Sequence, residues 1–146
     1  MKIAFPTLSI LLLILSVSTV IAHGKKAPGP NGGRLLTVVT PHAEFFVTPD
    51  RHVQITFVDD ALQPVPLTDQ SVILTAGSRT APTTLNFVRD GEVLRSDRPL
   101  PPGQNFPAVV QLKTAANAQT AVARFNVNFS TCPECDYPEY ACICDH

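Results

Sequence analysis

Hydrophobic and polar residues alternate along several short stretches of this chain. The clearest case is 53–57, where Val53, Ile55 and Phe57 fall on one face and polar residues on the other. The stretch 121–129 has the same period, with small and aromatic residues on one face and Arg and Asn on the other. A period of two is typical of a β-strand that is buried on one face. No stretch has a convincing helical period.

Turn residues separate these stretches and set the expected strand boundaries. Asp90-Gly91 between two apolar runs is a strong hairpin signal, and Thr48-Pro49-Asp50 closes another run. The pattern predicts an all-β fold, a single antiparallel immunoglobulin-like sandwich of seven to eight strands over residues 34–130. The expected strands are 35–39, 43–47, 53–57, 71–76, 84–88, 92–96, 106–113 and 121–129, with a proline-broken edge segment over 62–67.

The N-terminal segment reads as an export signal. A basic start at Lys2 is followed by an apolar run over 8–21, and the sequence ending in Ala22 suits signal peptidase. We therefore expect a signal peptide over 1–22, a secreted or periplasmic location, and no membrane span after cleavage. Residues 23–33 are rich in Pro and Gly and poor in apolar side chains, so they are expected to form a flexible arm.

Composition narrows the class of function. The chain has 11 Lys and Arg against 12 Asp and Glu, which argues against a nucleic-acid partner because such proteins carry a basic patch. The predicted domain contains no nucleophile elbow and no phosphate-binding glycine loop. The sequence therefore predicts a protein that is not an enzyme.

All four cysteines lie in the C-terminal tail, which we place at 131–146. They are spaced Cys-x2-Cys, six residues, then Cys-x-Cys-x-His, and a Cys-x2-Cys turn places two sulfurs on one side of a knuckle. Four thiolates, or three plus the histidine, suit Zn(II) or Cu(I). The candidate metal ligands are Cys132, Cys135, Cys142, Cys144 and His146.

Export leaves a second interpretation of the same cysteines open. Disulfides persist in oxidising compartments, so the tail could be closed by two disulfides on a structural or interaction module. Pairing Cys142 with Cys144 would strain the ring, so each is expected to pair with Cys132 or Cys135. A thioredoxin-like redox role would need a βαβ setting, which the pattern does not predict.

A possible second metal site lies at the expected mature N-terminus. His23 would carry a free α-amine and an imidazole, a pair that chelates Cu(II). A histidine-brace copper oxidase would need a second histidine near this amine, and His42 and His52 are the domain's only candidates.

One stretch resembles a known family. Pro30-Asn31-Gly32-Gly33-Arg34-Leu35-Leu36 is similar to the segment that opens the periplasmic β domain of heavy-metal efflux adaptor (membrane fusion) proteins of the RND type. The similarity continues through 44–50 and 53–66. Many of those adaptors have His where this chain has Asn31. The family's hairpin and lipoyl-like domains have no counterpart here. The resemblance implies a detached periplasmic β module linked to metal handling, with a membrane-associated metal transport component as a possible partner.

Together these features favour a non-catalytic, secreted or periplasmic protein that carries or buffers a soft metal ion, copper or zinc, in its Cys/His tail. The alternative is a structural or interaction sandwich with a disulfide-closed tail.

Overall fold

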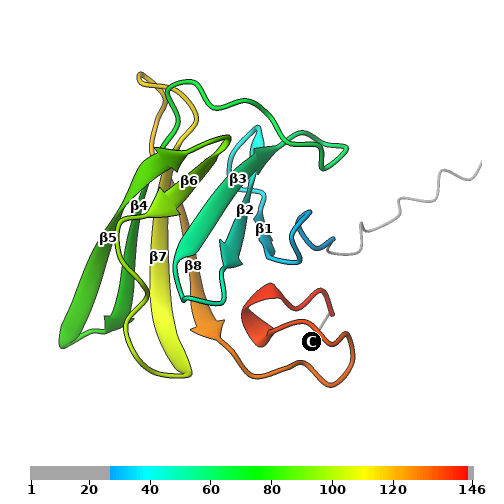
Figure 1. The fold of residues 1–146 in the computed structure, drawn as a ribbon, viewed down its shortest axis with the longest axis vertical. Coiled ribbons are helices and arrows are strands. Elements are labelled where there is room, and N and C mark those ends of the chain that lie inside the picture. Colours follow the sequence, from blue (N-terminus) through cyan, green and yellow to red (C-terminus); the bar gives the residue numbers. More distant parts are fainter. Residues whose placement is uncertain (1–26, 145–146) are drawn as a thin grey trace, which may run out of the picture.

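The fold is seen in a computed structural model, which describes residues 27–144. The predicted signal peptide over 1–22, His23 and His146 lie outside the described residues. Eight strands and one short 3-10 helix make up the described chain (Figure 1). They are β1 (Arg34–Leu36), β2 (His42–Val47), β3 (Val53–Val58), β4 (Ser71–Ser78), β5 (Ala81–Asp90), β6 (Val93–Ser96), β7 (Asn105–Lys113), β8 (Ala121–Asn128) and η1 (Glu139–Ala141).

All the strand pairings are antiparallel, and the strand order is β1-β2-β3-β6-β5-β4-β7-β8. Strand β5 belongs to both layers of the sandwich. Its first part pairs with β4, from Ser78↔Ala81 to Ile73↔Asn86, and its last part pairs with β6, from Phe87↔Ser96 to Asp90↔Val93. The sheet is therefore continuous, and it folds over on itself into a nearly closed sandwich. The predicted all-β sandwich is confirmed, and so is the hairpin at Asp90-Gly91.

The core lies between the two layers and follows the alternation in the sequence. Val53, Ile55 and Phe57 of β3 are fully buried, as their shared face predicts. From the other layer, Leu74 and Val110 are equally buried. Burial of an aliphatic or aromatic side chain contributes about 1.5–3 kcal/mol, so this shared interior is the main source of stability.

One predicted strand is shorter than expected, and one predicted edge segment does not form a strand. The strand expected over 35–39 ends at Leu36, because residues 37–41 turn the chain so that Leu36 pairs with Ala43 of β2. The proline-broken segment over 62–67 makes only one isolated bridge, Val58↔Pro64. Prolines supply no N–H donor for a ladder, which explains why this segment does not continue as a strand.

The arm predicted over 23–33 has a defined turn at its end. Gly29 donates a backbone hydrogen bond to Gly33 and accepts one from Gly32. Both the backbone and the side chain of Asn31, and the N–H of Gly33, donate to the carboxylate of Glu44 at 2.7–2.8 Å. Glu44 is fully buried, so these donors replace the water that its carboxylate loses.

Strands β1 and β8 are the two edges of the sheet, and the C-terminal segment lies against both. Helix η1 packs on β1 and on β8 (Figure 1). The ring of Tyr140 meets Phe45 and Phe129 edge to face at 5.9 and 6.0 Å, and Phe45 meets Phe125 of β8 at 5.1 Å. The cysteine tail is thus anchored to the sandwich by its aromatic residue. Within residues 27–144, no helix is both long enough and apolar enough to cross a bilayer.

Candidate metal centre

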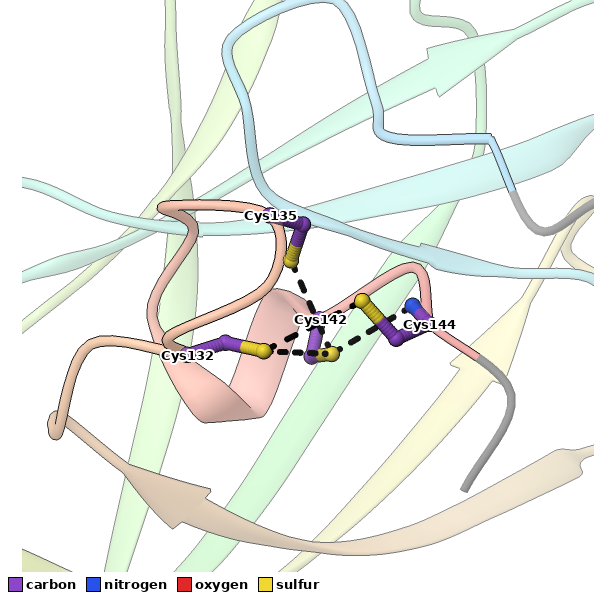
Figure 2. A group of neighbouring side chains, drawn as sticks. All are labelled: Cys132, Cys135, Cys142 and Cys144. Carbon is purple, nitrogen blue, oxygen red and sulfur yellow. Dashed lines mark hydrogen bonds between the residues drawn. The ribbon is translucent and has the colours of Figure 1, made fainter.

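The four cysteines of the tail converge on one point. Their Sγ atoms all lie within 4.8 Å of one another. Figure 2 shows Cys132 and Cys135 on one loop facing Cys142 and Cys144 on the segment that follows η1. The Sγ of Cys142 lies 3.4 Å from that of Cys132 and 3.7 Å from that of Cys135, and the Sγ atoms of Cys132 and Cys144 are 3.9 Å apart.

The first pair is held by a tight turn. The N–H of Asp136 donates to the carbonyl of Cys132 at 3.1 Å, and the N–H of Cys132 donates to the carbonyl of Tyr137 at 2.8 Å. Asp136 has a left-handed backbone with φ of 60°, a conformation that Asp tolerates better than most residues. This turn reverses the chain directly after Cys135, so both sulfurs of the Cys-x2-Cys motif point to the same side.

The second pair follows η1. Pro138 precedes the helix, and the N–H of Cys142 donates to the carbonyl of Glu139 at 3.2 Å, which ends the turn. The chain is then extended, and the backbone N–H of Cys144 donates to the Sγ of Cys142 at 3.3 Å. This N–H stabilises the thiolate and by itself lowers the pKa of Cys142, but burial and the neighbouring thiols Cys132 and Cys135 leave that pKa above its ordinary value.

The sulfur distances fit a tetrahedral metal site. A metal–sulfur bond of about 2.3 Å requires sulfurs roughly 3.8 Å apart at the corners of a regular tetrahedron. Three of the six Sγ–Sγ separations, 3.4–3.9 Å, are close to that value, and all six are within 4.8 Å. A disulfide needs sulfurs about 2.0 Å apart, and the structure shows the four side chains as thiols. The geometry is therefore that of a closed four-thiolate set that could hold a metal ion.

The four thiols differ in acidity. The backbone N–H of Ile143 donates to Cys135 and lowers the pKa of that thiol to about 7. Burial raises the pKa of Cys144, and the neighbouring thiols raise it further. Four thiolates in so small a volume repel one another, so full ionisation needs a cation among them.

The acidic residues of the described tail are not part of the cluster. The group that could ligate a metal consists, within the described residues, of the four cysteines alone. Glu134 and Asp136 are exposed and Glu139 is half-buried. Their negative charges make the surroundings attractive to a cation.

The histidines are not brought to this cluster in the described structure. His42 begins β2 and pairs with Val58, whereas His52 precedes Val53, which pairs with Val47 at the other end of the same ladder. His42 and His52, the domain's two candidates for a histidine brace, therefore lie at opposite ends of this ladder. His146 and His23, which the sequence proposed as a fifth ligand and as a second site, lie outside the described residues.

Sequence reasoning missed three residues that hold the tail or the glycine turn in place. Tyr140 anchors the tail, Glu44 fixes the glycine turn, and the guanidinium of Arg34 donates to the carbonyl of Tyr140 at 3.3 Å. Glu44 lies between the core residues Ala43 and Phe45, so its side chain points to the opposite face of β2, where the glycine turn covers it. Its partner Asn31 could not be found from sequence alone.

No protein-family model, no curated protein and no solved structure matches this chain.

Proposed function

We propose that this protein is a small, non-catalytic metal-binding protein that holds one ion through the thiolates of Cys132, Cys135, Cys142 and Cys144. One observation carries the proposal, namely the convergence of four Sγ atoms within 4.8 Å of one another, with three of the separations close to those of a tetrahedral site. The backbone donor that lowers the pKa of Cys135 supports it because it favours a thiolate, and the carboxylates of the tail support it because they attract a cation.

Zinc is our first choice of metal, with Cu(I) second. A tetrahedral set of four sulfurs is typical of Zn(II), and thiolates also select Cu(I). Zinc needs no redox chemistry, so the site can hold it without an electron donor. Four thiolates complete a tetrahedral set, so a fifth ligand is not needed. In this proposal His146 does not bind the ion directly.

We further propose that the protein works after export as a carrier or buffer in metal homeostasis. The apolar N-terminal run supports export, and the similarity to efflux adaptor domains supports a link to a membrane-associated metal transport component. Cys135, Cys142 and Cys144 are only partly buried, so an ion held between them is within reach of an acceptor. In this proposal the sandwich is the carrier body, and the tail is the site.

The test is a zinc titration of the mature chain, residues 23–146, in the presence of a reductant and a competing chromophoric chelator. We expect one ion per chain. Each single Cys→Ser variant should weaken binding by more than the roughly 10–100-fold that loss of an outer-shell partner costs. Thr131→Ala, an exposed change beside Cys132, should leave binding unchanged. The variant His23→Ala shows whether any of the bound zinc is held at the N-terminus.

Two results would count against the proposal. Zinc binding that survives all four Cys→Ser changes would place the ion elsewhere. Protein taken directly from its native compartment with neither accessible thiols nor bound metal would instead favour the disulfide-closed interaction module. A histidine-brace oxidase remains the enzymatic alternative, and it falls if the mature N-terminus is not His23.

A further inference from the structure

A small hollow opens beside the cysteine cluster, between β1 and the tail. Its volume is about 210 Å³. The β1 side contributes Arg34, Leu35 and Thr37, and the tail contributes Ala141, Cys142 and Ile143. Pockets for drug-sized ligands measure about 300–1,000 Å³, so this hollow suits a smaller molecule.

Arg34 supplies a positive charge to the hollow. Its side chain is half-buried, which lowers its pKa below the ordinary 12.5. One nitrogen, Nη1, donates to the carbonyl of Tyr140 at 3.3 Å, and the guanidinium lies 4.7 Å from the ring centre of Phe125. Among residues 27–144 no carboxylate forms an ion pair with it. A guanidinium carries five N–H donors, so most of its hydrogen-bonding capacity remains for an anion.

Cys142 forms part of the same wall. It is one of the four proposed metal ligands, and its Sγ lies closest to that of Cys132. A molecule in the hollow would therefore approach the ion from the Cys142 side. Ala141, Leu35 and Ile143 give the rest of the wall an apolar character that suits a short carbon chain.

We propose that this hollow is the port through which the metal is exchanged, and that it accepts a small thiol carrying a carboxylate. The inference rests on the proposed function. The carboxylate pairs with Arg34, for which a planar anion is the preferred partner. The sulfur of the incoming thiol binds the metal, because a site made of soft thiolate ligands can exchange one thiolate for another. The bond from the metal to Cys142 breaks as the bond to the incoming sulfur forms, and the proton leaving the incoming thiol passes to the Cys142 thiolate.

The experiment follows zinc release from the loaded mature chain to an indicator in excess. Two probe thiols of similar size are compared, 3-mercaptopropionate and the neutral 3-mercapto-1-propanol. In the wild type, the carboxylate thiol should accelerate release several-fold more than the neutral one. Arg34→Gln should remove that difference, and Arg34→Lys should keep part of it. Propionate, which lacks sulfur, should compete with mercaptopropionate and leave mercaptopropanol unaffected.

Arg124→Gln is the matched control, because it removes the same charge from a different groove, on the β7 and β8 surface. It should behave like the wild type. Equal acceleration by both thiols, no competition by propionate, or an equal effect of Arg34→Gln on both thiols would overturn the port while leaving the metal site intact. Failure of the wild type to load zinc would overturn both. Should Arg34→Gln not fold, the propionate competition on the wild type still decides the question.

Discussion

The backbone N–H of Val47 donates a hydrogen bond to the hydroxyl of Tyr140 at 3.1 Å. The two residues are far apart in the sequence, and this contact joins the last position of β2 to the helix that precedes the second cysteine pair. The candidate metal ligands are therefore positioned by the sandwich as well as by the turns of the tail.

Changes at Tyr140 should separate these two contributions. Tyr140→Phe removes one hydrogen bond and keeps the ring contacts, so we expect a loss of about 1 kcal/mol in the free energy of unfolding. Tyr140→Ala also empties the place of a buried ring, at a cost of roughly 3 kcal/mol or more. Zinc affinity should fall clearly only in the alanine variant. Urea unfolding and zinc competition measure both effects.

Tyr137→Phe, which removes a hydroxyl from the same tail, is the control for the phenylalanine change. If Tyr140→Ala binds zinc as tightly as the wild type does, the tail forms its site without help from the sandwich.

The buried carboxylate of Glu44 gives a second prediction. Glu44→Gln keeps the size of the side chain but removes the charge and turns an NH₂ group towards the donors of Asn31 and Gly33. An unsatisfied buried polar group costs about 1–3 kcal/mol, so we expect a loss of stability in that range. Asn31→Ala leaves the backbone donors in place and should cost less. Equal stability of Glu44→Gln and wild type in thermal unfolding would contradict this account.

Most of the strands could be predicted from the sequence, because burial on one face leaves a period of two. Val53, Ile55 and Phe57 show this directly, and the Asp90-Gly91 turn set the register of its hairpin. Strand β5 was harder to delimit, since its residues are mostly exposed and it changes layers partway along. Its apolar residues do not alternate regularly with polar ones along the whole strand.

The candidate metal site was only partly predictable. Its ligand types and their spacing were visible in the sequence, and the four cysteines do meet. The anchoring role of Tyr140 could not be predicted, because the sequence of a polar tail does not indicate which surface a tyrosine packs against. The same holds for Arg34, whose role depends on a tail more than a hundred positions away in the sequence.

A third prediction concerns acid stability. The hydroxyl of Thr48 donates to Asp50 at 2.5 Å, and together with the guanidinium of Arg95 it holds the pKa of Asp50 at about 2, below the ordinary 3.8. The imidazole of His52, 3.2 Å away, adds to this when it is protonated. A lowered carboxyl pKa stabilises the fold above the unfolded-state pKa, and that contribution is lost as the pH falls through the folded value.

The free energy of unfolding should therefore decline between about pH 4 and pH 2 in the wild type, and less steeply in Asp50→Asn. The measurement is urea unfolding of metal-free protein over that pH range, which keeps proton competition for the thiolates out of the result. Asp69→Asn, a change at an exposed carboxylate, should follow the wild-type curve. Parallel curves for Asp50→Asn and wild type would disprove this prediction.

A fourth prediction links metal and fold. Because η1 packs against both edge strands, ion binding at the tail should stabilise the sandwich. At free zinc about 100 times the dissociation constant, the free energy of unfolding should rise by about 2.7 kcal/mol. A chelator should reverse the change, and Cys142→Ser should show little of it. If zinc leaves the melting temperature unchanged, the tail and the sandwich unfold independently.

The central claim is that four thiolates surround one ion. X-ray absorption at the zinc edge of the loaded mature chain tests it most directly. The account predicts four sulfur neighbours at about 2.3 Å and no nitrogen or oxygen in the first shell. A first shell with fewer sulfurs, completed by nitrogen or oxygen, would contradict it.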